Sequence, residues 1–455
     1  MESSAASAEN TKNSVAAVRG KLLRGKKGNV IQSASNCVIA LREDPVLKDH
    51  IYLDEMSEQI CIAGPVPWMR SDDCRFTDAD FNNIVARLEK FYELTNDKKI
   101  ERAISIVAND NRRNKLIEHL ESLVWDGIPR VGMALHHFLG VETNEYTRRV
   151  LLFFMFGAIE RLYNPGCKFD YMLCLSGDQG SGKSTFFRFL AIRDGWFSDD
   201  MKKLNEDKSY TFLQGHWIIE LSELSALKNT KTNEAVKAFL SRQKDTYRTP
   251  YDRYPRDRKR QCVFAGTTNE KQFLPLDRSG NRRYLPVKVH PDQAEVHILD
   301  DEKASREYIG QVWAEGMAIW KSDRQALIKL QKKIEPLAAA YREEFSPEDT
   351  VAGQIYEFLE TCRYTKVCSR MLYREALGRT FEEPKHYELR DIAEIVNAGI
   401  ASGRIRGWKA FNGSQRFQTY GTQRGWERIS DPLEKLPNDT DEFVPVPVQE
   451  ELPFK

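Results

Sequence analysis

A glycine-rich segment near the middle of the chain has the residue types and the spacing that bind phosphate. Residues 177–185 read GDQGSGKST and match the pattern G-x-x-x-x-G-K-[ST]. In such a loop the glycines let backbone N–H groups surround phosphate oxygens, the lysine neutralises the outer phosphates and the serine hydroxyl ligates Mg²⁺. We therefore expect ATP and Mg²⁺ to bind at Gly177, Asp178, Gln179, Gly180, Ser181, Gly182, Lys183, Ser184 and Thr185.

The segments on either side of this loop fit the prediction. Residues 171–175 are a short apolar run of strand length, and residues 183–192 carry apolar side chains at the spacing of a buried helix. The alternative is a chance glycine-rich turn between a strand and a helix. The order of strand, glycine loop and helix, with every fixed position filled, favours the phosphate-binding interpretation.

Two acidic residues accompany a second apolar strand. Residues 217–219 are apolar, Glu220 follows them at the carboxyl end of the predicted strand, and Glu223 lies three residues further. Parallel sheets place their ligands at the carboxyl ends of strands. We expect Glu220 to ligate the metal or to act as the base, with Glu223 in support. The alternative is a pair of surface carboxylates at a strand end.

Two further motifs complete the predicted catalytic set. Asn269 follows the apolar run of residues 262–266 and can hydrogen-bond the terminal phosphate and the attacking water without adding negative charge. Arg282 and Arg283 precede the last predicted core strand, where in ring ATPases an arginine reaches the nucleotide of the neighbouring subunit. The alternative for these arginines is surface ion pairs, which we prefer for Arg278.

A basic, tyrosine-bearing segment lies between the acidic strand and the asparagine strand. Its cations can contact a phosphate backbone and its tyrosines can stack on bases, although a solvated loop or a subunit interface would have the same composition. The candidate nucleic-acid residues are Lys244, Arg248, Tyr251, Arg253, Arg256, Arg258, Lys259 and Arg260.

Composition and patterning predict an α/β protein of several parts. The chain has 455 residues, 41% of them hydrophobic, and a formal net charge of +1. No apolar stretch is long enough for a bilayer helix and the first twenty residues lack a signal-peptide core, so we expect a cytoplasmic protein of a bacterial cell, away from membranes. The predicted parts are a disordered leader (1–28), a mostly helical N-terminal domain of α+β type (29–167), an ATPase core (168–290), a helical connector (291–349), a C-terminal domain (350–430) and an acidic disordered tail (431–455).

The C-terminal domain shows the pattern of a winged helix. Three helical segments are followed by two short strand-like runs on either side of Asn412-Gly413, which predicts a hairpin with its turn at that dipeptide. Basic residues in and near the hairpin suggest contacts with duplex DNA through phosphates. These residues are Arg404, Arg406, Lys409, Arg416, Arg424 and Arg428.

Taken together, the motifs resemble those of the virulence-associated E (VapE/VirE) family. The segments that carry the resemblance are WDGIPRV, PGCKFDYMLCLSGDQGSGKST, WIIELSEL, YRTPYDRYPRDRK, FAGTTN and DRSGNRRYLPV. The resemblance implies a P-loop ATPase of the AAA+ class, similar to the ring helicases of small DNA viruses and plasmids and encoded by a phage, a prophage or a mobile genetic element. It implies a homo-oligomeric ring, expected to be a hexamer, that acts on single-stranded DNA in its channel.

Two features depart from the family pattern, and two other functions compete with that of a motor. The acidic strand carries Glu220 and Glu223 instead of an adjacent acid pair, and the short segment before residue 29 leaves no room for a fused primase, so a separate primase is the expected partner. A regulatory switch that assembles on DNA or protein without unwinding is the second candidate. A small-molecule phosphotransferase is the third, and the asparagine and the paired arginines disfavour it.

Overall fold

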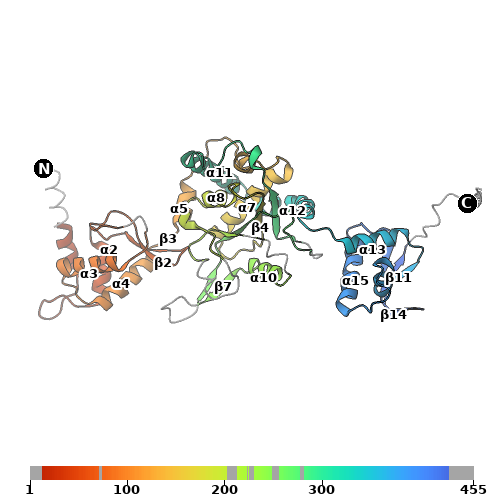
Figure 1. Cartoon of the computed structure of the whole chain (residues 1–455). Helices are drawn as coiled ribbons and strands as arrows, with labels where there is room; N and C mark the ends of the chain where they lie inside the picture. The colour runs from red at the N-terminus through yellow and green to blue at the C-terminus, as the bar shows by residue number, and fades with distance from the viewer. Residues whose placement is uncertain are drawn as a thin grey trace, which may run out of the picture. The chain divides into compact units, whose positions relative to one another are not determined.

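The computed structural model describes residues 13–70, 74–201, 213–222, 224, 230–247, 256–276 and 281–429. The described residues within Met1–Pro275 and Arg282–Ser346 form one compact unit. Those within Leu276–Asn281 and Pro347–Lys455 form a second. Figure 1 shows the elements of both.

The N-terminal part of the first unit combines helices with a three-stranded sheet of order β2-β1-β3. Strands β1 and β2 form an antiparallel pair, and Thr77 and Asp80 form a capping box at the start of α3. The elements are α2 (Ala34–Glu43), β1 (Ile51–Asp54), β2 (Gln59–Ile62), α3 (Asp78–Tyr92), α4 (Asp97–Asp110) and β3 (Arg112–Arg113).

Ordered structure begins earlier than the sequence predicts. Residues 13–21 are helical, and Val15, Val18 and Leu22 are buried in the apolar core that includes α2 and α4. The prediction of a disordered leader is therefore wrong over residues 13–28. Burial of apolar side chains at helical spacing stabilises the segment and offsets the conformational entropy lost on ordering. Residues 1–12 and the predicted tail at 431–455 lie outside the described residues.

A five-stranded sheet of order β10-β4-β9-β6-β5 forms the centre of the first unit. Every pairing in it is parallel. Strands β4 and β9 are buried along their whole length, as expected for a parallel sheet covered on both faces. The predicted α/β class is thus confirmed. The strands are β4 (Met172–Ser176), β5 (Phe197–Ser198), β6 (Ile218–Leu221), β9 (Val263–Thr268) and β10 (Tyr284–Lys288).

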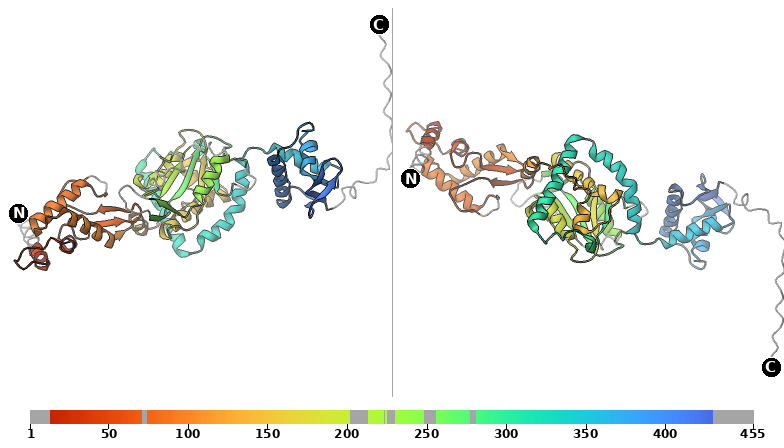
Figure 2. Two further views of the ribbon diagram at one scale, coloured as in Figure 1. Left: turned by 90° about the horizontal axis from the view of Figure 1, so that it is seen from below. Right: turned by 90° about the horizontal axis from the view of Figure 1, so that it is seen from above.

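Helices that precede and follow the predicted ATPase core in the sequence pack onto this sheet. In the two views of Figure 2 the helices surround the sheet. Phe153 and Phe154 of α7 share one apolar core with Leu173 of β4 and Trp313 of α11. The predicted boundary at residue 168 therefore does not separate two cores, because α7 needs the sheet to cover its apolar surface. The helices are α5 (Lys115–Ser122), α6 (Ala134–Leu139), α7 (Glu145–Tyr163), α8 (Lys183–Leu190), α10 (Thr230–Leu240), α11 (Glu302–Ser322) and α12 (Ala326–Glu344).

The second unit has a core of its own around Ile355, Ile395 and Trp426. Its main sheet has the order β11-β15-β12 and is antiparallel. Its elements are α13 (Thr350–Thr361), β11 (Lys366–Cys368), α14 (Ser369–Met371), the π-helical turn η4 (Leu372–Ala376), α15 (His386–Ala401), β12 (Trp408–Ala410), β13 (Gln415–Phe417), β14 (Gly421–Gln423) and β15 (Gly425–Arg428).

The predicted hairpin turn at Asn412-Gly413 is wrong. Strand β12 pairs with β15, and β13 pairs with β14, so the two arms fold back at residues 418–420. Gly413 does have a positive φ of 77°, but it lies where one arm contains extra residues between the two paired regions. A dipeptide that permits a tight turn also permits this irregularity, so its presence does not fix the turn position.

Among the described helices, none has both the length and the apolar character needed to cross a bilayer.

Candidate functional site

The glycine loop, residues 177–182, connects β4 to α8 at the carboxyl edge of the central sheet. From β4 the chain passes to β5 and β6 and returns through β9 beside β4, whereas β10 pairs with the opposite side of β4. Open parallel sheets bind ligands at such a reversal of strand order. Gly180 and Gly182 adopt φ values of 81° and 79°, which suit glycine, and α8 directs its first N–H groups at the loop.

Lys183 occupies the centre of this loop. Its Nζ donates hydrogen bonds to the carbonyl oxygens of Gly177 and Asp178 at 2.8 and 2.7 Å, and lies 3.0 Å from Ser181 Oγ. Burial lowers the pKa of the Lys183 ammonium, while the charges of Asp178 and Glu220 oppose that shift. The ammonium is thus held at the loop, where an anion can replace the carbonyls as its partner.

Glu220 is fully buried in β6, next to the glycine loop. Ser184 Oγ donates to Glu220 Oε1 at 2.7 Å, and Thr267 Oγ1 donates to the same oxygen. No described group hydrogen-bonds the other oxygen, Oε2, which is also buried. Burial raises the pKa of the carboxyl group, and the two hydroxyl hydrogen bonds act in the opposite direction.

These oxygens fit Mg²⁺. A serine hydroxyl and a carboxylate in contact, with one carboxylate oxygen left over, match an ion that takes one or two protein oxygens and completes its shell with water and phosphate. The described residues contain no cluster of three or more His, Cys, Asp or Glu side chains arranged to hold a metal, so a metal held entirely by such side chains finds no support there.

Asn269 meets the glycine loop from the neighbouring strand. It follows β9, and its Oδ1 lies 3.2 Å from Lys183 Nζ. The structure therefore brings the predicted site residues Glu220 and Asn269 together with Lys183 and Ser184, from which they are distant in sequence. Glu223 lies outside the described residues.

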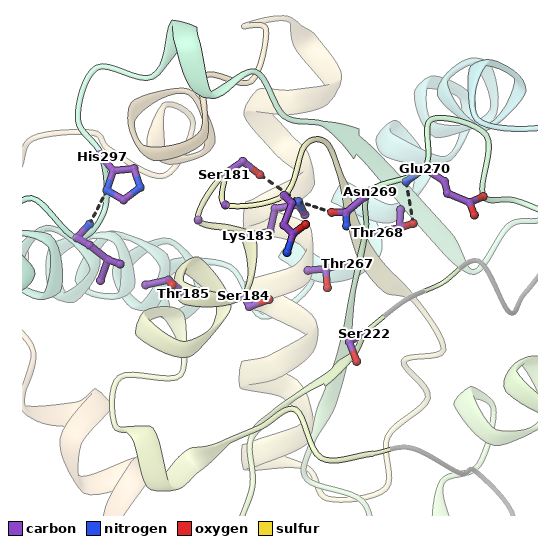
Figure 3. Close-up of a pocket in the computed structure, with 14 residues that line it drawn as sticks. Ser181, Lys183, Ser184, Thr185, Ser222, Thr267, Thr268, Asn269, Glu270 and His297 are labelled. Carbon is purple, nitrogen blue, oxygen red and sulfur yellow. Dashed lines mark hydrogen bonds between the residues drawn. The ribbon is translucent and has the colours of Figure 1, made fainter.

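A cavity of about 610 Å³ opens over Lys183, Ser184 and Asn269 (Figure 3). It is large enough for a nucleotide. Residues 179–185 line it together with Ser222, Thr267, Thr268, Asn269, Glu270, His297 and Leu299. The lining residues that were not predicted from the sequence are Ser222, Thr267, Thr268, Glu270, His297 and Leu299. Ser222 follows the acidic strand and could have been found from that position, whereas no pattern marks His297 or Leu299.

The two predicted trans-acting arginines lie at the other edge of the sheet. Tyr284 pairs with Met172, so Arg282 and Arg283 are at the amino ends of β10 and β4, roughly 17 Å of strand away from the glycine loop. Both contact Asp170, at 2.9 and 3.2 Å. The side chain of Arg282 is 43% exposed and that of Arg283 is 21% exposed. Neither lines the cavity of its own chain, and Arg278 lies outside the described residues.

The basic segment forms an antiparallel hairpin of β7 (Lys244–Tyr247) and β8 (Arg256–Lys259). Three of its predicted nucleic-acid residues contact carboxylates: Lys244 pairs with Asp257, Arg258 with Glu58, and Arg260 with Asp245.

Arg260 requires a correction, because it is buried and donates to both carboxylate oxygens of Asp245, at 2.6 and 2.9 Å. A buried guanidinium cannot reach a phosphate backbone. Arg256 and Lys259 are exposed, and Arg248, Tyr251 and Arg253 lie outside the described residues.

The chain belongs to the family defined by the virulence-associated protein E-like domain, whose model matches residues 120–347. This range covers the central sheet and its packed helices, and confirms the resemblance found in the sequence. A comparison with curated proteins finds no match.

Solved structures of the C-terminal region of NrS-1 are weakly similar to the chain. An A-form apo structure shares 12% identity, covers 83% of this chain and 96% of that one, and has a TM-score of 0.44. A second A-form apo structure shares 13% identity, covers 83% of this chain and 96% of that one, and has a TM-score of 0.46. Another apo structure shares 12% identity, covers 83% of this chain and 95% of that one, and has a TM-score of 0.41. Similarity at this level says nothing about the chemistry of this chain.

Proposed function

We propose that the chain is an ATP-driven, DNA-dependent motor of the helicase type that serves the replication of a phage, a prophage or a mobile element. The observation that supports ATP and Mg²⁺ binding most strongly is Glu220, buried against Ser184 with one oxygen free of described partners and close to Lys183. Membership of the virulence-associated protein E-like family supports the assignment to mobile elements. The glycine loop, the acidic strand and the asparagine strand together support an AAA+-like P-loop core.

Each site residue then has a defined task. The loop N–H groups and Lys183 bind the phosphates, and Lys183 exchanges its carbonyl partners for phosphate oxygens. Ser184 and Glu220 would hold Mg²⁺, which would neutralise charge on the outer phosphates. Asn269 orients the attacking water beside the terminal phosphate. Glu220, whose side chain is poorly solvated, is also the candidate to accept a proton from that water.

Arg282 is the better candidate for completing a neighbouring subunit's site. It lies far from its own cavity and is more exposed than Arg283, which also contacts Ser241. Catalysis would then require a ring, which we expect to be a hexamer. Mixing an Arg282→Ala chain with a Lys183→Ala chain tests this, because mixed rings contain some interfaces with both groups intact. Recovery of hydrolysis supports the role in trans, and inactive mixed rings contradict it.

The element order of the second unit supports a winged helix. Helix α13, strand β11, the short helix α14 with η4, helix α15 and the β12–β15 pair follow one another, and β15 lies between β11 and β12. We propose weak, backbone-dominated binding of duplex DNA by exposed cations such as Arg406, Arg416 and Arg424. Arg428 is not among them, since it donates to backbone oxygens of Leu359 and Cys362.

A regulatory switch remains the second candidate, because three cations in the described part of the basic segment pair with carboxylates within the chain. The two are separated by the ATPase rate of the full chain with and without single-stranded DNA. A motor is expected to hydrolyse ATP several-fold faster when DNA is added. A rate that ignores DNA while ATP is still hydrolysed would favour the switch, whose partner would then be a protein or a separate primase.

A further inference from the structure

The cavity above the glycine loop has two chemically different ends (Figure 3). Ser222, Thr267 and Asn269 line one end, with Lys183 in the middle, and His297 lies at the other end beyond Thr185. The first end carries the hydroxyl and amide groups suited to the terminal phosphate. A nucleotide with its phosphates on the loop must therefore direct its sugar and base towards His297.

The segment that forms this second end, residues 290–299, is here called the strap. It is anchored to helix α6 and the residues beside it by backbone hydrogen bonds from His290 N to Leu139 O at 2.9 Å and from Val296 N to His137 O at 3.1 Å. Glu295 adds a side-chain contact of 2.6 Å to His137 Nδ1. Three anchors over a short segment hold the strap in place before any ligand binds.

Ile298 fixes the orientation of the strap towards the loop. Its side chain is fully buried in the core of the first unit, and a Cβ added to Gly182 would lie 3.2 Å from Ile298 Cγ2. Its two neighbours in the chain, His297 and Leu299, both line the cavity. Leu299 is 50% exposed and borders the cavity. An apolar side chain and an aromatic ring at the wall of a cavity are the groups that cover the face of a base.

We infer that His297 and Leu299 form a nucleobase subsite that holds a purine by contact with its faces. The inference rests on the proposed binding of a nucleoside triphosphate at the glycine loop. Contacts to ring faces recognise every base, and the larger face of a purine gains more from them than that of a pyrimidine. The subsite therefore raises affinity for ATP and GTP alike over the pyrimidine nucleotides.

The test compares ATP with inorganic triphosphate, which has the phosphates and lacks the base. Binding of each with Mg²⁺ is measured by calorimetry on the full chain, for wild type, Leu299→Ala, His297→Ala and Val296→Ala. Val296 is a matched control, because it is a partly exposed strap residue that does not line the cavity. We expect Leu299→Ala and His297→Ala to weaken ATP about tenfold and to leave triphosphate unchanged. Val296→Ala should change neither.

The outcomes separate this inference from the proposed function. If wild type binds neither ATP nor triphosphate, the proposed phosphate site itself is wrong, and the subsite is wrong with it. If wild type binds ATP while Leu299→Ala and His297→Ala bind it equally well, the base lies elsewhere and only the subsite is overturned. Equal weakening of ATP and triphosphate also overturns it, because the strap would then act on the phosphates.

Discussion

The carboxyl edge of the central sheet and the β7–β8 hairpin both gather charged side chains, but they differ in whether those charges are satisfied. At the sheet edge, buried Glu220 keeps one oxygen without a hydrogen-bond partner among the described residues. In the hairpin segment, the Arg260 guanidinium donates hydrogen bonds to both carboxylate oxygens of Asp245. Buried polar groups are normally hydrogen-bonded, so a free one indicates a place for a ligand. Charge density alone therefore does not distinguish a binding site from a stabilising contact.

The largest effect on stability is expected at Arg260, next to the hairpin. Arg260→Ala leaves the Asp245 carboxylate buried without its partner, so we expect the free energy of unfolding to fall by about 3–5 kcal/mol. Urea denaturation measures this. Lys244→Ala is the matched control, because its pair with Asp257 is largely exposed and should contribute much less to stability. Equal, small losses in both variants would show that Arg260 is not structural.

A smaller effect is expected at the sheet edge, with the opposite sign. Burial raises the folded-state pKa of Glu220 above its unfolded value, so the folded protein binds more protons than the unfolded one between the two values. Its contribution to stability therefore falls as pH rises through that window. Glu220→Gln should stabilise the ligand-free protein at pH 7.5 and make little difference at pH 4, when measured by thermal denaturation. Lower stability of the variant at pH 7.5 would mean that the carboxylate is structural.

The smallest effect concerns the exposed cations of the hairpin. Arg256→Ala and Lys259→Ala should each weaken single-stranded DNA binding a few-fold, and reduce the slope of log affinity against log salt by roughly one phosphate contact. Fluorescence anisotropy at several salt concentrations gives both values. If neither affinity nor slope changes, the described part of the hairpin does not contact DNA.

The strands and the glycine loop were predictable because their signals are local. Apolar runs precede Gly177 and Glu220, and the loop pattern fixes its own residues. The pairing of charges was not predictable, because the partners are distant in sequence. Glu58 meets Arg258, and Thr267 meets Glu220, only after the chain has folded.

Two further differences have the same physical origin. The helix at residues 13–21 was missed because a polar, charged composition outweighed three apolar residues at helical spacing. The strap was missed because His297 and Leu299 have no periodic pattern, and their place is set by anchors on α6 that no local signal reveals.

We propose that the carboxyl edge of the central sheet binds and hydrolyses ATP with Mg²⁺. The most direct test measures ATP binding and single-turnover hydrolysis in parallel for wild type, Lys183→Ala and Glu220→Gln. We expect hydrolysis to fall by about 10²–10³-fold or more in both variants, while Glu220→Gln still binds ATP and retains it. Circular dichroism should show that Lys183→Ala is folded. Hydrolysis at the wild-type rate in either purified, folded variant would contradict the assignment of this site.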